Sequence, residues 1–366
     1  MRPSIDQQGR PRVLVAGGGV AALEAVLALR SLAGDRVRVE LLAPSAGFAQ
    51  RPYSVRSPFG GAAAPDVSFD RTHVVHHAGA LAVADPERRE VVTTDGGTLR
   101  YDRLIVATGA RSVDAVPGAT LFRGPISAGA VEAAVRDARK RAIFTVPAQT
   151  AWTLPAYELA LLAAAQSQEP LSLMVVSPEA RPLELFGPVA SDAVARLLIR
   201  AGVEFLPGAA PDSRLGESLL LRDGRVIAAD AVVALPRPVG RSVRGLPADA
   251  GGFIPIDEHA RVAGIPGVYA AGDITAGPVK QGGLATQQAD AAAEAIAAEA
   301  GVDIEPRPYR PVLRAMLLTG GDPLYLTRDL SDDTAPDRAS RSPLWWPSAK
   351  VVGRHLTGYL AGGRVA

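Results

Sequence analysis

The sequence contains no cysteine at all. A chain without thiols cannot form a redox disulfide, a thiolate nucleophile, a persulfide intermediate, an iron–sulfur cluster or a cysteine-ligated zinc site. Any electron transfer by this chain must therefore proceed without cysteine chemistry.

Long apolar runs and a charge imbalance are also missing. No stretch of 18 apolar residues occurs, and residues 1–11 lack the apolar run of a signal peptide. The formal net charge is only +1, which argues against nucleic acid or another polyanion as a partner. We therefore expect a soluble, cytoplasmic protein. Its 366 residues, of which 48% are hydrophobic, suffice for two or three hydrophobic cores.

The first informative segment is a glycine-rich turn between a predicted strand and a predicted helix. Residues 12–16 alternate like a strand, residues 21–32 follow a helical period, and G-x-G-x-x-A lies between them. Glycines there permit a tight turn and let the backbone approach a pyrophosphate, which rests on the N–H groups of the helix N-terminus. The positions that would bind it are Gly17, Gly19, Val20, Ala21 and Ala22.

A second strand is predicted over residues 37–42, at the spacing of a βαβ unit. This context favours a dinucleotide site over a glycine turn without a ligand. The acid that usually ends this strand and binds the adenosine ribose is absent, because Ala43 stands near its place. Glu40 is close in count, but the direction of its side chain is uncertain. We expect the ribose contact from Ser45 or from the backbone instead.

A second nucleotide-type segment lies far downstream, in "GVYAAGDITAGPVKQGGLATQQAD". Residues 268–271 read as a buried strand, Gly272 permits close approach, and Asp273 follows at the carboxyl end, where ligands bind in open α/β sheets. A helix is predicted from about residue 283, and its first N–H groups present partial positive charge. The binding candidates at its start are Gln281, Gly282 and Gly283.

Together, "VAGGGVAA", "LRYDRLIVATGA", "GVYAAGDI" and "PVKQGGLATQQAD" resemble the flavin-binding signature of the two-dinucleotide-domain flavoproteins. The resemblance covers roughly residues 12–300. It is strongest to the branch of type II NADH dehydrogenases, sulfide:quinone reductases and flavocytochrome c sulfide dehydrogenases. "PVKQGG" is similar to the Pro-x-Lys-Thr-Gly segment of the sulfide:quinone group, with Gln281 in place of threonine.

The resemblance implies FAD as a non-covalent cofactor and assigns roles to individual positions. Gly17, Gly19 and Ala22 would hold the FAD pyrophosphate, and Asp273 would bond the ribityl or phosphate portion. The adenine-side crevice would be bordered by Ala107, Thr108 and Gly109, and the loop "FAQRPYSV" would bring Arg51 and Pro52 near the flavin.

Lys280 is the catalytic candidate. Reduction of a flavin places negative charge on its pyrimidine end, and a nearby cation and helix N-terminus would stabilise that charge and raise the reduction potential. The alternative interpretation is a solvated loop lysine.

The sequence also repeats itself. "VVTTDGGTLRYDRLIVATGA" and "SLLLRDGRVIAADAVVALPR" share a strand, an Asp-Gly hairpin turn, at Asp95 and Asp223, and a second and third strand. We therefore predict an α/β protein with two tandem Rossmann-like dinucleotide-binding domains, the second inserted into the first. The predicted divisions are 1–117 and 248–305 for the FAD domain, 118–247 for the inserted NAD(P)-like domain, and 306–366 for a small C-terminal region.

The second copy has lost the glycines of the first. Its turn reads "VPAQTAWTLPA", in which Pro147 and Pro155 have no N–H to offer, no residue lacks a Cβ, and Trp152 can fill the crevice. Ala107-Thr108-Gly109 of the first copy corresponds to Ala234-Leu235-Pro236. We infer that the second copy does not bind NAD(P)H; an unusual nicotinamide site is the alternative. Sulfide-oxidising members of the similar family likewise do without a nicotinamide.

The C-terminal region is less informative. A hairpin is predicted around residues 320–322, followed by a polar loop and a short helix with Ser348 as its N-cap. That helix could dock on a membrane, contact a second copy in a homodimer, or pack on its own domain. Trp345 and Trp346 could wall the substrate face or serve as packing anchors. In the helix, Val352, Leu356, Tyr359 and Leu360 share an apolar face, and Lys350, Arg354 and Thr357 lie off it.

The pattern of the five histidines predicts no metal site. His73, His76 and His77 have a helical spacing within a segment that favours a strand. His259 and His355 have no evident partner.

The sequence thus predicts an FAD-dependent oxidoreductase that passes electrons between a small-molecule donor and an acceptor such as a quinone, a sulfur compound or oxygen. The alternatives are an NAD(P)H-dependent reductase and a flavin-binding sensor or assembly protein with little turnover.

Overall fold

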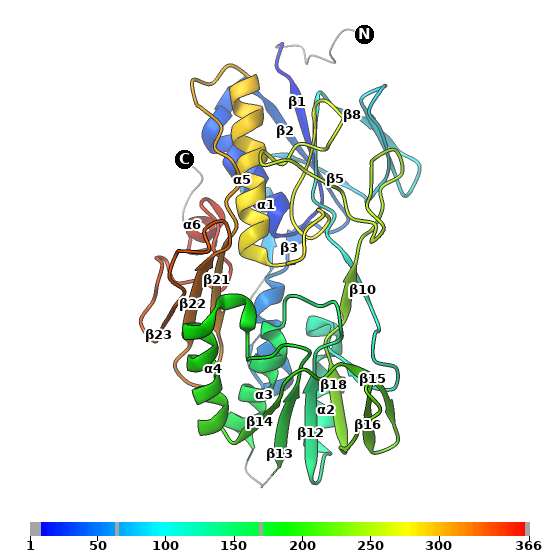
Figure 1. Cartoon of the computed structure of the whole chain (residues 1–366). Coiled ribbons are helices and arrows are strands. Elements are labelled where there is room, and N and C mark those ends of the chain that lie inside the picture. Colours follow the sequence, from blue (N-terminus) through cyan, green and yellow to red (C-terminus); the bar gives the residue numbers. More distant parts are fainter. Residues whose placement is uncertain (1–8, 63–65, 168–170, 363–366) are drawn as a thin grey trace.

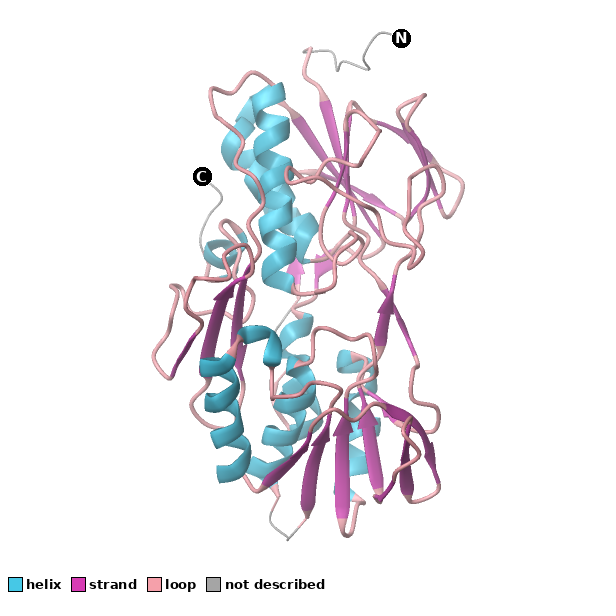
Figure 2. Ribbon diagram, in the orientation of Figure 1, coloured by secondary structure: helices cyan, strands magenta, loops and turns pink. Residues whose placement is uncertain are grey.

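The structure is a computed structural model that describes residues 9–62, 66–167 and 171–362. Two parallel β-sheets lie one above the other along the molecule, each with helices packed on it, and a small antiparallel sheet lies beside them (Figures 1 and 2). This arrangement confirms the predicted α/β fold with two Rossmann-like domains and a small C-terminal region.

The first sheet has the order β20-β9-β1-β2-β5, with every neighbouring pair parallel. Strand β20 follows the second domain in the sequence and returns to this sheet. The second domain is therefore inserted between two strands of the first. Helices α1 and α5 pack on one face and a three-stranded antiparallel sheet covers the other. The elements are β1 (Arg12–Ala16), α1 (Val20–Ala33), β2 (Arg38–Ala43), β5 (Val75–Ala78), β6 (Leu81–Asp85), β7 (Glu90–Thr93), β8 (Thr98–Arg100), β9 (Arg103–Val106), β20 (Val268–Ala270) and α5 (Gly282–Glu299).

The second sheet has the order β11-β18-β12-β13-β14, also entirely parallel. It carries its own three-stranded antiparallel sheet. The elements are β11 (Thr120–Leu121), α2 (Ala128–Arg136), β12 (Arg141–Thr145), α3 (Leu154–Gln166), β13 (Ser172–Val176), α4 (Pro188–Arg200), β14 (Val203–Leu206), β15 (Pro211–Leu215), β16 (Ser218–Leu221), β17 (Val226–Ala228) and β18 (Ala231–Ala234).

The two sheets repeat one topology. In each, the strand before the nucleotide-type turn, β1 or β12, lies in the centre, and the next strand along the chain, β2 or β13, is its neighbour. The Asp95 and Asp223 turns join β7 to β8 and β16 to β17, as the hairpin signal predicts. The internal repeat is therefore structural as well as sequential.

The chain crosses between the two sheets at two places that pair with each other. Strand β10 (Arg111–Val113) leads into the second domain, and β19 (Arg237–Val239) leads back, as an antiparallel pair between the sheets (Figure 1). Both crossings precede the boundaries predicted at residues 117 and 247, whose positions stay a prediction.

Helices α1 and α5 pack closely because their shared face is made of alanine. Ala25, Ala289, Ala292 and Ala293 are all fully buried there. The close packing brings the two helix N-termini together. A Cβ added at Gly282 would lie 3.9 Å from Cγ1 of Val20.

The C-terminal region confirms one prediction and corrects others. The predicted hairpin is present, but Ser348 is not an N-cap, because the last helix begins at Leu356 with His355 before it. Leu356 and Tyr359 are buried in the core that contains α1. The region contains β21 (Val312–Leu317), β22 (Leu324–Asp329), β23 (Arg338–Ser340) and α6 (Leu356–Leu360).

Internal packing of the helix was one of the expected arrangements, and a membrane or homodimer contact through it stays a prediction. Trp345 stacks edge-on against Tyr325 at 5.1 Å, whereas Trp346 is 86% exposed. Neither tryptophan lines the cavity described below. Within the described residues, no helix is both long and apolar enough to cross a membrane.

Short elements complete the chain. They include η2 (Arg51–Phe59), a 3₁₀ segment that contributes to the site. The others are small connections: β3 (Gly47–Phe48), β4 (Val67–Ser68), η1 (Gly34–Arg36), η3 (Phe69–Thr72), η4 (Gly124–Ser127) and η5 (Glu184–Phe186).

Candidate functional site

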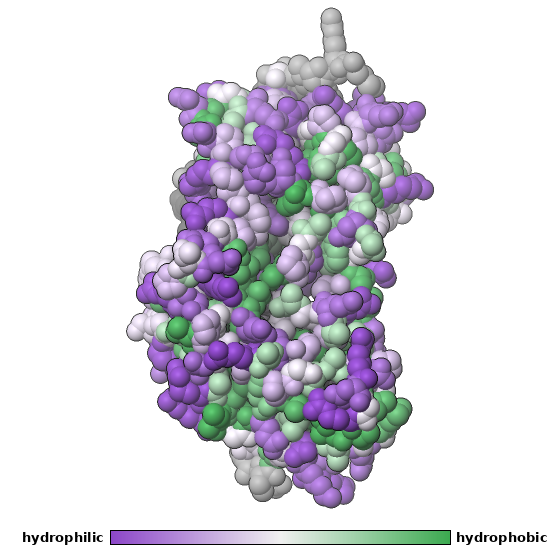
Figure 3. Space-filling view, viewed as in Figure 1, coloured by the Kyte–Doolittle hydropathy of each residue, from purple (hydrophilic) through white to green (hydrophobic). Residues whose placement is uncertain are grey.

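A cavity of about 790 Å³ lies between the two sheets. Its lining comes from the turn between β1 and α1, from η2, from the segments after β9 and β20, from the turns after β12 and β18, and from residues 350 and 351. Apolar residues are visible along the hollow between the upper and lower parts of the molecule (Figure 3). Both domains and the C-terminal region therefore share one site.

The glycine turn at the start of α1 is shaped to admit a ligand. Gly17 has φ of 144°, and a Cβ there would collide with the carbonyl oxygen of Ala107. At Gly19, the N-cap of α1, an added Cβ would meet nothing within 4 Å, and no side chain caps the helix. The N–H groups of the first helical turn have no intrahelical partner, so this open space suits a diphosphate.

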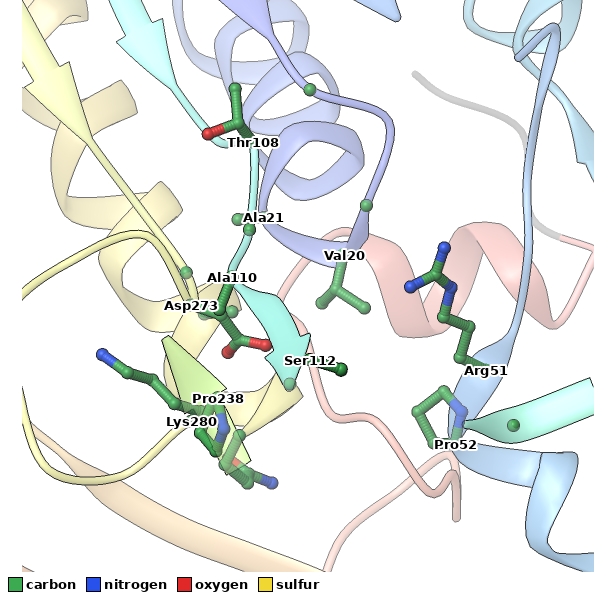
Figure 4. A pocket seen from close by; sticks show the side chains of 18 of the residues that line it. Val20, Ala21, Arg51, Pro52, Thr108, Ala110, Ser112, Pro238, Asp273 and Lys280 are labelled. Atoms are coloured by element: carbon green, nitrogen blue, oxygen red, sulfur yellow. The ribbon is translucent and has the colours of Figure 1, made fainter. Parts of the chain in front are cut away.

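The segment after β20 forms the adjoining wall of the site, since a Cβ at Gly272 would lie 3.0 Å from Cβ of Ala21. Gly272, with φ of 82°, donates its N–H to Oε1 of Gln288 at 2.8 Å. Asp273 projects into the cavity (Figure 4). Burial raises the pKa of Asp273, and the positive charges of Lys280 and Arg51 partly offset this. One buried carboxyl and two cations thus lie at this end of the cavity.

Lys280 lines the cavity, but its ammonium group is held at the edge. Nζ donates to the carbonyl oxygen of Thr275 and lies 3.8 Å from the centre of the Phe253 ring. Figure 4 shows it directed away from the Asp273 carboxylate. Burial lowers the pKa of Lys280, and the charge of Asp273 opposes this. Lys280 is therefore not a solvated loop lysine.

Gln281 is the N-cap of α5 and has its polar atoms engaged. Its Oε1 accepts the N–H of Leu284 at 2.8 Å and its Nε2 donates to the carbonyl of Arg314 at 3.0 Å. The side chain that replaces threonine in the similar motif thus joins α5 to β21.

The structure brings most of the predicted residues to one cavity. Three lie behind its lining: Ala22 and Ala43 are fully buried, and Gly283 packs against the Gln281 side chain. Those that line it are Gly17, Gly19, Val20, Ala21, Ser45, Arg51, Pro52, Ala107, Thr108, Gly109, Gly272, Asp273, Lys280, Gln281 and Gly282.

Glu40, the uncertain ribose candidate, is not in the cavity. Its carboxylate is bonded to His77 Nε2 at 2.7 Å and forms salt bridges with Arg12 and Arg38. Since His76 also bonds the carbonyl of Ala43, both histidines are engaged in the sheet.

Several polar atoms in the cavity wall have no partner. Thr108 Oγ1, Thr150 Oγ1 and Glu158 Oε2 are buried and form no hydrogen bond within the described part of the chain. Leaving a buried polar group unpaired costs about 1–3 kcal/mol. The cavity is therefore built for a polar ligand, which fits a dinucleotide cofactor next to the open glycine turn.

The degenerate turn of the second copy forms the other end of the cavity. Trp152 and Pro155 both line it, and Trp152 packs against Phe186 with ring centres 5.9 Å apart. Gln149 has a left-handed φ of 64° without being glycine. Side chains, and not open backbone, thus form the wall of the cavity at this turn.

Sequence reasoning missed Glu179, which follows β13 where a ribose-binding acid of the second copy would stand. Its carboxylate accepts hydrogen bonds from Tyr157 Oη at 2.7 Å, Ser177 Oγ at 2.9 Å, Thr153 Oγ1 at 3.0 Å and the N–H of Glu184 at 3.2 Å. All four interactions are internal, so this acid serves the fold.

Sequence reasoning also missed a buried ion pair in the cavity wall. Glu158 of α3 and Lys350 of the C-terminal region pair at 2.5 Å between Nζ and Oε1, with side chains 1% and 5% exposed. Burial raises the pKa of Glu158 and lowers that of Lys350. Lys350, which the sequence placed on a polar helix face, is not exposed. The only sequence signal was a glutamate within an otherwise apolar helix.

The comparisons with known proteins agree with this geometry. Residues 11–295 match the model of the pyridine nucleotide-disulphide oxidoreductase family. The chain belongs to that family. As a member it is an FAD-dependent oxidoreductase, and the expected FAD cofactor is confirmed at that level.

Relatives at the sequence level have NADH dehydrogenase-like names. Two such proteins from Mycobacterium tuberculosis strains are 26% and 27% identical over 309 residues, spanning 72% of this chain and 73% of each relative.

Solved structures share the fold. The sulfide:quinone oxidoreductase of the hyperthermophilic bacterium Aquifex aeolicus superposes with a TM-score of 0.81 at 17% identity, covering 90% of this chain and 87% of that one. The ferredoxin reductase of the CYP199A2 system from Rhodopseudomonas palustris gives a TM-score of 0.67 at 21% identity, covering 87% and 82%.

Proposed function

We propose that this oxidoreductase takes electrons from a small donor other than NAD(P)H and passes them to a quinone. The observation that carries the proposal is the buried Glu158–Lys350 pair in the cavity wall, with one glutamate oxygen unpartnered. A quinone must gain two protons with its two electrons, and this pair can hold a proton beside the cavity.

The chain's own residues fit FAD at the other end of the cavity. The open backbone at Gly19 and Val20 would hold the diphosphate, and Asp273 and Thr108 offer polar side chains to the rest of the molecule. Bound FAD would supply the two-electron redox chemistry that the side chains of a chain without cysteine cannot.

The acceptor end combines an apolar wall with this one charged pair. Trp152, Leu154 and Pro155 line it, and such side chains suit a flat, mostly apolar ring. Burial raises the pKa of Glu158, which favours uptake of a proton by its carboxylate. Protonated Glu158 can then donate one of the two protons that the quinone takes up, while the ammonium group of Lys350 stabilises negative charge on the carbonyl oxygen.

Two features support a donor other than NAD(P)H. The second turn lacks glycine and contains two prolines, so it cannot supply the convergent N–H groups of a pyrophosphate site. The carboxylate of Glu179 already accepts hydrogen bonds from side chains of its own domain, such as Tyr157 and Ser177. The second candidate is an NAD(P)H-dependent reductase, which the names of the mycobacterial relatives favour.

The test uses FAD-loaded protein reduced anaerobically with one equivalent of dithionite and then mixed with a short-chain ubiquinone. We expect rapid reoxidation by the wild type and a rate at least tenfold lower for Glu158→Gln, since loss of general acid catalysis costs about 10²–10⁴ in rate. Glu132→Gln, which changes an exposed glutamate of α2, is the matched control.

Reoxidation by oxygen but not by quinone would contradict the proposed acceptor. Equal quinone rates for the wild type and Glu158→Gln would contradict the role of the pair. Rapid, saturable reduction of the oxidised protein by NADH or NADPH would favour the second candidate. If no reductant reduces the flavin of the wild type and no quinone reoxidises it, the result would point to a flavin-binding sensor.

A further inference from the structure

Three side chains of metal-ligating type meet outside the cavity. Glu24 comes from α1, Asp290 from α5, and His355 is the residue before α6. One ligand atom from each lies within 4.8 Å of the others. Glu24 is fully buried, and none of the three lines the cavity. The cluster is therefore separate from the redox site.

Two of the ligand atoms meet no N–H donor. His355 Nε2 and Asp290 Oδ1 are both buried without one among the described residues, and the Asp290 carboxyl group has the Glu24 carboxyl group as its hydrogen-bonding neighbour. Glu24 accepts backbone N–H groups from His355 at 2.8 Å and Leu356 at 2.7 Å, and these fix the direction of its carboxylate. Each carboxylate oxygen has more than one lone pair, so Glu24 can still coordinate.

The charges around the cluster do not compensate its two carboxyl groups. Arg354 is the nearby cation, but it bonds Glu294 Oε1 at 2.8 Å, and Arg307 pairs with the same glutamate. Two adjacent buried carboxyl groups need either a shared proton or a cation.

We propose that Glu24, Asp290 and His355 bind one divalent transition-metal ion, with Zn²⁺ as the preferred species. One imidazole nitrogen with two carboxylate oxygens suits zinc better than magnesium or calcium, which take oxygen ligands. In a tetrahedral site with ligands about 2.0–2.1 Å from Zn²⁺, the ligand atoms lie about 3.3–3.4 Å apart. The three ligand atoms, which lie within 4.8 Å of one another, must therefore approach by up to about 1.5 Å to close the site.

The metal would have a structural role. Its three ligands belong to α1, α5 and the C-terminal region. A hydrogen bond from Thr286 Oγ1 to the carbonyl of Val352 at 2.7 Å already joins α5 to the C-terminal region. The joined segment begins beside Lys350, the partner of Glu158. A metal there would lock the C-terminal region onto the two helices whose N-termini border the cavity.

The test titrates ZnCl₂ into FAD-loaded protein that has been treated with a chelator and dialysed. Calorimetry should show one ion bound per chain, and the Tm should rise with ZnCl₂ but not with MgCl₂. Asp290→Asn and His355→Gln should each weaken binding at least tenfold, because each removes one of three ligands. His73→Gln, which changes an exposed histidine, should leave binding unchanged.

Each variant is first checked for retained FAD absorbance and far-UV circular dichroism, and two ligand variants guard against the misfolding of one. No zinc binding by the wild type, with Asp290→Asn as stable as the wild type or more so, would show that the carboxyl groups share a proton and would overturn the proposal. Binding that survives both ligand variants but not His73→Gln would place the zinc at the surface and overturn it equally.

Discussion

The turns after β1 and β12 occupy the same place in two copies of one sheet, yet only the first is open. Beside Gly19 there is free space and an uncapped helix N-terminus. In the second copy the corresponding turn holds no glycine, and Trp152 packs on Phe186. The comparison shows that the topology fixes where a nucleotide could bind, whereas a few residues in the turn decide whether the backbone can reach it.

The acids near the second strand of each copy, Glu40 and Glu179, are both engaged in contacts within the protein. Glu40 is bonded to His77, Arg12 and Arg38, and Glu179 has four internal donors. Neither carboxylate can accept a ribose hydroxyl without giving up internal partners. In the first copy Ser45 lines the cavity, and its hydroxyl, which donates to the carbonyl of Gly47 at 3.0 Å, can still accept a hydrogen bond, so the ribose contact from Ser45 or the backbone stays a prediction.

The largest effect should come from Gly17→Ala. A Cβ at this position, with φ of 144°, would strike the Ala107 carbonyl, so we expect a loss of about 3 kcal/mol or more in stability together with loss of FAD. In the second turn, Gln149→Gly should change the free energy of unfolding by less than about 1 kcal/mol. Gln149 has a positive φ of 64°, which glycine adopts without steric cost.

Urea unfolding and FAD absorbance after gel filtration measure both variants. Equal losses from the two substitutions would mean that the turns are equally constrained, which would remove the contrast between them.

Trp152→Gly asks whether bulk alone closes the second turn. We expect a loss of about 2–3 kcal/mol from the vacated contact with Phe186, and no gain of NADH reactivity, since the prolines and the occupied Glu179 remain. Stopped-flow reduction by NADH is the measurement. The appearance of saturable reduction would show that the indole was the only obstacle.

The third prediction concerns pH. Burial raises the pKa of Glu179 in the folded state above its usual value, so its contribution to stability is complete below about pH 4.5 and is lost as pH rises through the folded pKa. The free energy of unfolding of Glu179→Gln should therefore fall less than that of the wild type between pH 4.5 and 7. Urea titrations across that range compare the two proteins, and parallel curves would contradict the expected shift.

The smallest effect is expected from Lys280→Met. The variant should lower the midpoint potential of the bound cofactor by the equivalent of about 1 kcal/mol or less, because the lysine is only partly buried and its ammonium group lies over Phe253 and against Thr275. Lys140→Met, far from the cavity at the start of β12, is the control. An unchanged midpoint potential would contradict an electrostatic effect of Lys280 on the cofactor and would leave it only its contacts with Thr275 and Phe253.

Local pattern was sufficient for much of the fold. The alternation before Gly17, the helical period after it and the Asp-Gly turns at Asp95 and Asp223 depend on neighbours in the chain, and the structure has these elements where the sequence predicts them. The start of the C-terminal helix could not be predicted from the local pattern. The sequence predicts Ser348 as its N-cap, but the helix begins at Leu356, where Glu24 of α1 accepts the N–H groups of His355 and Leu356.

The candidate site divides in the same way. Positions such as Gly19 and Asp273 could be predicted because a backbone cradle and a strand end are encoded in a few adjacent residues. Glu158 and Lys350 could not, because they are far apart in the sequence and each resembles an ordinary charged residue on a helix. Their pairing, and the meeting of Glu24 with Asp290 and His355, depends on how three segments pack.

The sequence by itself determined that the chain has two copies of one nucleotide-binding topology, that only the first keeps its glycines, and that the chain has no cysteine thiol of its own. These properties follow from residue type and from spacings of a few residues. Only the tertiary structure decided that both copies and the C-terminal region share one cavity, and that a buried carboxyl meets a lysine in its wall. Burial and charge pairing are set by contacts between segments distant in the chain, so the amino-acid pattern of any one segment cannot reveal them.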